Sequence, residues 1–397
     1  MDWPQRIKDV QSHLKAEKID GWLLFDFHAQ NSLARNFLNI DSNRLITRRF
    51  FYWIPAQGEP VQLLHKIESH VLEGLPGKKK IYLKWQEMES SLGDLLKGSR
   101  TVAMEYSPRN AIPYLSQVDA GVIDLVRSYG VEVVSSGNFL QYYTCVLDQS
   151  QVESHLEAAS FLDRTAGKTW EWIALHLRGD KKITEYDVRM FIVEEFRRKN
   201  FISAGLPICA VNAHSADPHF EPKKEDRTPI QLGDFILIDL WCKKNTPRAV
   251  YGDITRVAVA AEKATPRQEE IFTIVRHAQK TATDYVAKRW AAQEAIKGFE
   301  VDRVTRQVIE DAGYGQYFTH RTGHNIYTED HGPGAHIDSL ETLDLRELVP
   351  STCFSIEPGI YLPGEFGVRL EYDIYLKPDH TIEVTGGIQE VITTICL

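Results

Sequence analysis

Hydrophobic and polar residues alternate in two rhythms along the first third of the chain. Short apolar runs with the composition of strands are separated by longer segments whose apolar residues recur three and four positions apart, as on one face of a helix. The expected strands cover 20–26, 50–55, 61–66, 81–85, 101–106 and 131–136, and the expected helices cover 6–18, 67–75, 90–98 and 120–130. This order predicts a mixed α/β sheet with helices packed on it.

The pattern changes near residue 150, where long helices begin to dominate. Residues 150–177 have the apolar spacing of one long helix. Capping-box patterns at Thr184–Asp187 and Thr265–Gln268 predict the starts of two further helices. The expected strands of this part cover 235–242, 250–260, 353–362 and 368–376.

At 397 residues the chain is long enough for two hydrophobic cores. We therefore expect two domains, 1–148 and 149–397. The net charge of −9 argues against a nucleic-acid or anionic-membrane partner. No apolar run is long enough to span a membrane and the N-terminus has no signal-peptide core, so a cytoplasmic location is expected. The five cysteines form no CxxC pair and are typical of reduced core thiols: Cys145, Cys209, Cys242, Cys353 and Cys396.

Four carboxylates and one imidazole in the second half of the chain indicate a metal site. Three of the carboxylates lie inside apolar strand-like runs, where an unpaired charge is costly to bury. Such an oxygen-rich set suits two hard or borderline divalent cations, which can share bridging carboxylates. The five candidates are Asp239 in FILIDLW, Asp253 in YGDITR, His324 in HRTGHN, Glu357 in SIEPGIY and Glu371 in GVRLEYD.

Two of the carboxylates also have ordinary explanations when each is taken alone. Asp253 could cap the turn before the next strand, although a hairpin would set it opposite Asp239. Glu371 alternates with Arg369 and Asp373 along one expected strand, so the three side chains would share a face and could form an exposed Arg–Glu ladder.

The segment HRTGHNIYTEDHG is unusually dense in groups that carry chemistry. It holds His320, His324 and His331 within twelve residues, together with Asp330. Glycines between them permit close backbone approach. This density favours a functional role over a purely structural one.

Taken together, GDITR, HRTGH, IEPGIY and GVRLEYD resemble, in this order, the motifs of the pita-bread (M24) metallopeptidases. This is the clan of methionine aminopeptidase, aminopeptidase P and prolidase, and the match covers nearly the whole chain. The N-terminal α/β domain resembles the creatinase-type domain of the aminopeptidase P and prolidase branch, which methionine aminopeptidases lack. The resemblance implies a creatinase-type α/β domain over 1–148, followed by a pita-bread α+β catalytic domain over 149–397.

The resemblance also implies a ligand role for each of the five candidates. Asp239 would bind one metal ion, and His324 and Glu357 would bind the other. Asp253 and Glu371 would bridge the two ions. A metal-bridged water or hydroxide would be the nucleophile, and Glu357 would take the proton from that water. Manganese is the commonest metal of this branch, with cobalt and zinc as alternatives.

Four further residues match positions that surround the substrate in the family. The stretch PHFEP resembles the segment that carries an upstream active-site histidine, here His219. His219 and His331 would bind the substrate near the scissile bond and stabilise the tetrahedral intermediate. Arg369 and His320 would support the ligands and the substrate from behind.

The implied activity is removal of an N-terminal residue from Xaa-Pro peptides, as a Xaa-Pro dipeptidase or a Xaa-Pro aminopeptidase, by a homodimer acting on small peptides. A dipeptidase would need a clamp for the free carboxylate, and the N-terminal arginines are candidates unless they form a solvated basic patch. Two alternatives keep the fold: a metal-free creatinase-like amidinohydrolase and a non-catalytic binding module, both of which predict lost ligands. The candidate clamp residues are Arg35, Arg44, Arg48 and Arg49.

The chain departs from the family pattern in three places. The spacing of fourteen residues from Asp239 to Asp253 exceeds the usual eleven, which predicts an insertion in the turn between them. Asn325 stands where the family has glycine, and Gly332 stands where it has an acidic residue. These two departures concern the surroundings of the pocket and leave all five ligand positions intact.

Overall fold

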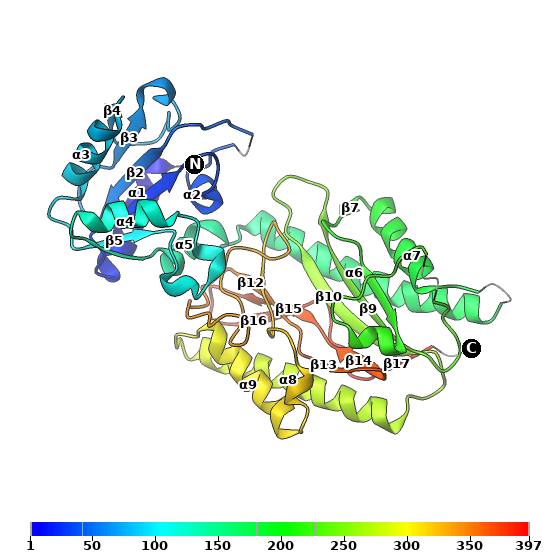
Figure 1. Cartoon of the computed structure of the whole chain (residues 1–397). Helices are drawn as coiled ribbons and strands as arrows, with labels where there is room; N and C mark the ends of the chain where they lie inside the picture. The colour runs from blue at the N-terminus through cyan, green and yellow to red at the C-terminus, as the bar shows by residue number, and fades with distance from the viewer. Residues whose placement is uncertain (1, 42, 180–181, 226–227, 396–397) are drawn as a thin grey trace. The chain divides into compact units, whose positions relative to one another are not determined.

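A computed structural model describes residues 2–41, 43–179, 182–225 and 228–395. The chain divides into two compact units, Met1–Thr144 and Cys145–Leu397 (Figure 1). Both units combine helices with sheets, so the α/β fold class expected from the sequence is confirmed. None of the helices in the described ranges is both long and apolar enough to cross a membrane.

The first unit is built on one six-stranded mixed sheet. Its strand order is β4-β3-β2-β1-β5-β6, with β2 antiparallel to both neighbours and the outer pairs parallel. Five strands fall where the apolar runs predicted them, whereas the strand expected over 81–85 forms earlier, as β4. The strands are β1 Gly21–Asp26, β2 Phe50–Pro55, β3 Val61–His65, β4 Lys78–Tyr82, β5 Thr101–Met104 and β6 Glu132–Ser135.

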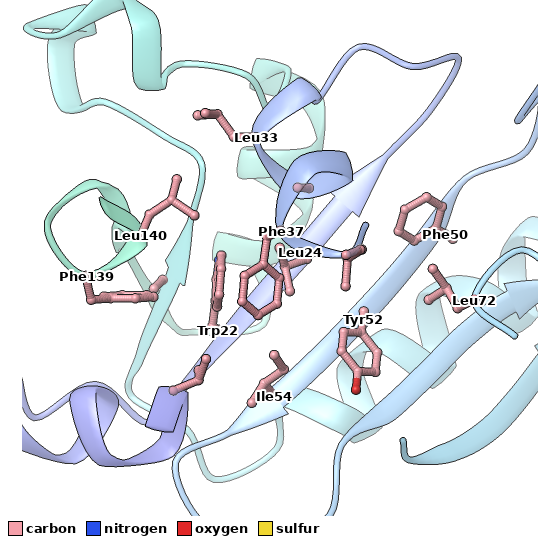
Figure 2. Packing of buried hydrophobic residues seen from close by; sticks show 14 of the residues in the cluster. Trp22, Leu24, Leu33, Phe37, Phe50, Tyr52, Ile54, Leu72, Phe139 and Leu140 are labelled. Atoms are coloured by element: carbon pink, nitrogen blue, oxygen red, sulfur yellow. The ribbon is translucent and has the colours of Figure 1, made fainter. Parts of the chain in front are cut away.

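The central strand β1 serves two hydrophobic cores, one on each face of this sheet. Trp22 and Leu24 point into one core, while Leu23 and Phe25 point into the other, as the two-residue period of a strand requires. Figure 2 shows the first core, where Trp22 lies against Phe37 at a ring-centroid distance of 4.4 Å. Burial of both faces therefore fixes the position of β1.

Three of the four helices expected in the first unit form, one does not, and two short helices were not predicted. The expected helix over 67–75 is wrong: only a 3₁₀ turn forms, η1 Lys66–Glu68, and Gly74 has φ +88°, which no α-helix accommodates. Two short helices, α2 and α5, have too few turns for their periodicity to be recognised. The helices are α1 Trp3–Ala16, α2 Ser32–Phe37, α3 Trp85–Leu96, α4 Ala120–Ser128 and α5 Gly137–Thr144, and short 3₁₀ turns lie at η2 Pro108–Asn110 and η3 Pro113–Leu115.

The arginines considered as a carboxylate clamp are used differently in this unit. Arg35 is 4% exposed, and its guanidinium binds Asp26 and the backbone carbonyls of Asp41 and Arg44. A buried guanidinium with these partners holds the fold together. Arg35 therefore does not fit the clamp, whereas Arg44 donates only to the carbonyl of His70 among the bonds described for its side chain.

Four long helices frame the second unit. Both predicted capping boxes are confirmed, with Thr184 accepting from the backbone of Asp187 and Thr265 from that of Gln268. These caps satisfy backbone N–H groups that the first helical turn leaves unpaired. The helices are α6 Gln149–Leu177, α7 Glu185–Arg198, α8 Pro266–Ala291 and α9 Gly298–Asp311, with 3₁₀ turns at η4 Asn212–Ala216 and η5 Gly315–Tyr317.

In the described part of the second unit, the strands form three sheets. One has the order β17-β10-β9-β7 with β8 also on β9, the second has the order β11-β12-β15-β16, and β13 pairs with β14 alone. The strands are β7 Phe201–Ile202, β8 Ile208–Val211, β9 Phe235–Lys244, β10 Gly252–Val259, β11 Asn325–Ile326, β12 Cys353–Ile356, β13 Gly359–Leu362, β14 Phe366–Arg369, β15 Tyr372–Leu376, β16 Ile382–Thr385 and β17 Thr393–Thr394.

The two faces of β9 pack on different helices. Ile236 and Ile238 join the core formed with α6 and α7, whereas Phe235 and Leu237 join the core formed with α8 (Figure 1). Asp239 belongs to the odd-numbered set and therefore points away from α6 and α7. The same alternation in β10 places the side chain of Asp253 on the same face of the sheet as that of Asp239.

The antiparallel pairing of β9 and β10 confirms the expected hairpin but corrects its register. Asp239 lies opposite Thr255, and Asp253 lies opposite Trp241. The two carboxylates are therefore diagonal neighbours on one face rather than a directly facing pair.

Two expected single strands are wrong, because each is broken in the middle. Residues 353–362 form β12 and β13, interrupted at Glu357 and Pro358, and proline cannot donate to a sheet ladder. Residues 368–376 form β14 and β15, interrupted at Leu370 and Glu371. Arg369, Glu371 and Asp373 consequently do not lie along one strand as the sequence suggested. Both candidate glutamates stand at chain breaks.

Gln279 of α8 forms hydrogen bonds with two carbonyl groups that have no strand partner because of the breaks. Its Nε2 donates to the carbonyl of Ile356 at 3.0 Å and to that of Leu370 at 2.9 Å. Gln279 is 2% exposed, so water does not reach this position. The amide of Gln279 therefore satisfies the two buried carbonyl groups in place of water. One helical side chain thus fixes the backbone just before both glutamates.

The described cysteines are buried. Cys145, Cys209, Cys242 and Cys353 form no disulfide among the residues with described positions. Cys242 lies in the even-numbered set of β9, on the face opposite Asp239. Cys396 lies outside the described residues.

Replacement of Gly323 by Ala is expected to destabilise the protein by about 1–3 kcal/mol, the usual range for overpacking. A Cβ atom at this position would lie 1.9 Å from the backbone oxygen of Ser355, which cannot move without opening β12. Chemical denaturation monitored by fluorescence measures the effect. The control is Gly167→Ala in α6, where a Cβ meets nothing within 4 Å and should stabilise the helix by about 0.5–1 kcal/mol. Equal stability of the two variants would contradict the prediction.

Candidate metal centre

The second unit brings the five candidate residues into one buried region. Asp239 and Asp253 come from β9 and β10, His324 precedes β11, and Glu357 and Glu371 occupy the two chain breaks. Asp253, His324 and Glu371 form the inner group, since one ligand atom of each lies within 4.8 Å of the others. Asp239 and Glu357 join this group through the contacts described below.

His324 links the inner group to Glu357. Its Nε2 lies 3.8 Å from Asp253 Oδ2 and 3.4 Å from Glu357 Oε1. Its Nδ1 faces the backbone carbonyl of Asn325 at 3.4 Å. A carbonyl only accepts, so Nδ1 carries the proton and Nε2 keeps a lone pair for a cation.

Thr255 links Asp239 to Glu371. Its hydroxyl donates to Glu371 Oε2 at 2.6 Å and lies 3.2 Å from Asp239 Oδ1, and it accepts from Arg369 Nε at 3.0 Å. Thr255 is completely buried. The hydroxyl therefore sets the distance between two carboxylates on neighbouring segments.

Arg369 is the cation nearest to Asp239. Its Nη2 donates to Asp239 Oδ2 at 2.5 Å, and its Nη1 donates to the hydroxyl of Tyr361 at 3.2 Å. That hydroxyl lies 2.6 Å from His320 Nε2, while His320 Nδ1 faces the carbonyl of Arg321. His320 therefore contacts no ligand directly and acts on Arg369 through Tyr361.

Burial shifts the pKa of several of these groups in the direction that favours the neutral form. Burial is the largest cause that raises the pKa of Asp253 well above its usual range, and repulsion from Glu371 is the next. Burial and then repulsion from Glu357 raise the pKa of Glu371 well above its usual range. Burial also raises the pKa of Glu357 to about 7 and lowers the pKa of His324 well below its usual range. A divalent cation would stabilise the deprotonated, ligating form of every one of these groups.

Asp253 carries the clearest sign that a cation belongs here. The residue is 5% exposed, and its Oδ1 is buried without a hydrogen-bond partner among the described residues. An unsatisfied buried carboxylate oxygen is costly, and a metal ion would satisfy it. Four carboxylates with one neutral imidazole are also the donor set that hard or borderline divalent ions prefer. The residues present therefore fit the expected ions.

The two predicted pocket histidines lie at the exposed edge of this region. The side chain of His331 is 57% exposed, and its ring packs on that of His324 at a centroid distance of 4.1 Å. Partial burial, followed by the charge of Arg321 and by His219, lowers the pKa of His331 to about 4. His219 is exposed on the segment after η4 and has an electrostatic effect on His331.

Arg321 selects the tautomer of His331. Its Nη2 lies 3.2 Å from His331 Nδ1, and a guanidinium can only donate, so Nδ1 must accept. The proton of a neutral His331 then sits on Nε2. His331 is therefore a hydrogen-bond donor at its Nε2.

Several supporting residues were missed in the sequence, although two of them carry a signal. Thr255 stands two positions after Asp253 in β10 and shares a strand face with it, and Ser355 stands two positions before Glu357, at the spacing that would share a face in a continuous strand. Ser355 Oγ donates to Glu357 Oε1 at 3.1 Å and accepts from the backbone N–H of His324 at 3.0 Å. Gln279 gives no comparable local signal, because its partners Ile356 and Leu370 are distant in the sequence.

The departures at positions 325 and 332 compensate for one another. Asn325 donates to the carbonyl of Cys353 at 2.9 Å and accepts from the backbone N–H of Gly334 at 2.9 Å. A Cβ atom at position 332 would lie 2.3 Å from Asn325 Oδ1. Glycine at 332 therefore makes room for the asparagine side chain that holds the loop.

Comparisons with known proteins agree with this arrangement. The model of metallopeptidase family M24 matches residues 154–378. The Xaa-Pro dipeptidase of Lactobacillus delbrueckii subsp. lactis is 36% identical over 164 residues, which cover 41% of this chain and 40% of that protein.

Solved structures resemble the whole chain. The dipeptidase PepE from Mycobacterium ulcerans superimposes with a TM-score of 0.70 at 22% identity, covering 99% of this chain and 98% of that chain. A recombinant prolidase from Thermococcus sibiricus gives a TM-score of 0.63 at 23% identity and covers 99% of each chain. The expected two-domain pita-bread fold is thereby confirmed.

Replacement of Thr255 by Val is expected to weaken divalent-cation binding and to destabilise the protein by about 1–3 kcal/mol. The change keeps the shape of the side chain but leaves Glu371 and Arg369 Nε without their buried partner. Calorimetric Mn²⁺ titration and chemical denaturation measure the two effects. Thr165→Val in α6 is the control, since its hydroxyl contacts only the carbonyl of Phe161. Unchanged cation affinity in the Thr255 variant would argue against its positioning role.

Proposed function

The chain belongs to metallopeptidase family M24, and from this premise we propose that it is an exopeptidase that uses two divalent metal ions to hydrolyse the bond between an N-terminal residue and proline. The observation that carries the proposal is the group of Asp253, His324 and Glu371, which Asp239 and Glu357 join, with Asp253 Oδ1 left without a hydrogen-bond partner among the described residues. The named activity of the Lactobacillus relative supports the preference for Xaa-Pro bonds.

The resemblance to the family suggests how these ligands would be shared. Asp239 would hold one ion, His324 and Glu357 would hold the other, and Asp253 and Glu371 would serve both. Two ions bound there would acidify a water molecule and polarise the peptide carbonyl. Manganese suits a set of four carboxylates and one imidazole, with cobalt and zinc as alternatives.

The protein groups around the ions orient the ligands and move protons. Ser355 holds Glu357 Oε1 by a hydrogen bond of 3.1 Å, and the Glu357 side chain keeps 14% exposure. Its carboxylate can therefore meet water at the edge of the cluster and accept a proton from it. His324 stays neutral, since burial lowers its pKa, and its Nε2 lone pair points toward the cluster because Nδ1 faces the backbone carbonyl of Asn325.

His331 and His219 occupy the side from which a peptide would arrive. With Nδ1 of His331 accepting from Arg321, its Nε2–H is available as a donor to the carbonyl oxygen, which gains negative charge during hydrolysis. Arg369 and His320 act from behind, by holding Asp239 through Arg369 itself and through Tyr361.

The metal-free alternatives are less well supported. A creatinase-like amidinohydrolase or a binding module would not need four buried carboxylates around one imidazole. All five positions retain ligand-type residues, and their mutual repulsion would be a pure cost without an ion.

Chelation is expected to abolish hydrolysis of Xaa-Pro peptides, and added Mn²⁺ is expected to restore it, because metal binding and activity are coupled. Activity is measured on Xaa-Pro dipeptides, Xaa-Pro tripeptides and matched peptides without proline. Preference for the dipeptide would identify a dipeptidase, and equal use of the tripeptide an aminopeptidase. Turnover that survives chelation, or that ignores proline, would overturn the proposal.

A pair of variants separates the ligands from the substrate-binding groups. Asp253→Asn should abolish both hydrolysis and paired ion binding, because this carboxylate would serve both ions. His331→Ala should lower kcat by about 10²-fold, as expected for loss of one oxyanion donor, and should leave both ions bound. Ion stoichiometry from calorimetry distinguishes the two results. Loss of ions in the His331 variant would make His331 a ligand instead.

A further inference from the structure

Glu185 is a buried carboxylate to which the proposed function gives no role. It is the first residue of α7 and is 2% exposed. Its Oε1 accepts from the backbone N–H of Val211 at 2.7 Å, and both of its oxygens lie 3.0 Å from Nδ1 of His214. Equal distances to the two oxygens fit an Nδ1–H that donates to a carboxylate. Glu185 therefore fixes the ring of His214 relative to the start of α7.

The ring of His214 in turn packs on that of Phe220. The two rings are stacked, with a centroid distance of 4.3 Å and an interplanar angle of 25°. The backbone N–H of Phe220 donates to the carbonyl of Asp217 at 3.1 Å, and Asp217 Oδ1 accepts from the backbone N–H of His219 at 3.0 Å. Residues 217–220 thus form a tight turn whose last residue is held by an aromatic stack.

The other side of this turn touches the candidate metal centre. The carbonyl of Pro218 accepts from Nη1 of Arg369 at 3.4 Å, and Nη2 of the same guanidinium donates to Asp239. A hydrogen bond of 3.4 Å is long, so it is a weak support for the turn when taken singly. The stack of Phe220 on His214 supplies the second point of attachment that fixes the orientation of the turn.

We infer that Glu185 and His214 are positioning residues, which hold Phe220 and thereby orient the turn 217–220 so that His219 faces the substrate. The inference rests on the proposed function, which gives His219 a role in substrate binding. His219 is exposed, and ordering an exposed segment only when the peptide binds would cost affinity. Attachment of the turn to a buried carboxylate avoids part of that cost before the substrate arrives.

Hydrolysis of a Xaa-Pro dipeptide by the full-length protein with Mn²⁺ tests the inference. Phe220→Leu removes the stack and should lower kcat/KM by about three- to tenfold, as expected for a stacked ring pair. Phe220→Tyr keeps the ring and should recover most of this loss, and Glu185→Gln should act in the same direction as Phe220→Leu. Glu195→Gln is the matched control, because Glu195 is also a buried carboxylate of α7 but binds Lys168 and Arg198. It should change kcat/KM by less than about twofold.

The same substitution in a His219→Ala background separates positioning from a general loss of structure. If Phe220 acts through His219, Phe220→Leu should change kcat/KM by less than about twofold once His219 is absent, because the effects of coupled residues do not add. An equal loss in both backgrounds would overturn the inference. Weaker Mn²⁺ binding in the Phe220→Leu variant would also overturn it, since the damage would then lie in the metal centre.

Hydrogen exchange of the full-length protein supplies a readout that needs no substrate. Phe220→Leu and Glu185→Gln should accelerate amide exchange within residues 212–220, whereas Glu195→Gln should not. Unchanged exchange in the first two variants would overturn the role of Glu185 and His214 in holding the turn. Accelerated exchange in a protein whose wild type does not hydrolyse Xaa-Pro peptides would instead overturn the proposed function and support the attachment of the turn.

Discussion

Buried negative charge is the constraint on which the second unit depends. Asp239, Asp253 and Glu371 are each less than 9% exposed, and Glu357 keeps 14% of its side-chain surface. Thr255, Ser355 and Arg369 donate to individual carboxylate oxygens, but they do not cover all of them. Such a cluster repels itself unless a positive charge enters it. Membership of a metallopeptidase family indicates which charge that is.

The architecture around the cluster follows from the same constraint. One face of β9 and β10 is covered by α6 and α7, so the other face is available for Asp239 and Asp253. Glu357 and Glu371 lie outside the hydrogen-bonded ladders of β12 and β15. They stand instead where each chain leaves one sheet for the next, and the irregular backbone there is satisfied by buried side chains.

Much of this fold was predictable from the sequence because its signals are local. Alternation within 235–242 and 250–260 located β9 and β10, and the Thr184–Asp187 capping box marked the start of α7. The register that makes Asp239 and Asp253 diagonal, and the breaks at both glutamates, depend on contacts between distant segments. Asn325 and Gly332 illustrate the difficulty: each looks like an isolated departure in the sequence, and only their contact in space explains both. The roles assigned to the site residues from the sequence remain predictions.

Gln279 gives the two chain breaks a common anchor. The two hydrogens of one amide go to the carbonyls of Ile356, at the end of β12, and Leu370, in the link between β14 and β15, which immediately precede Glu357 and Glu371. A displacement of α8 would therefore carry both glutamates in concert and leave the gap between them nearly constant. A shared anchor of this kind couples the positions of the two glutamates to one helix, so that a motion of one sheet alone would have to break a hydrogen bond to Gln279.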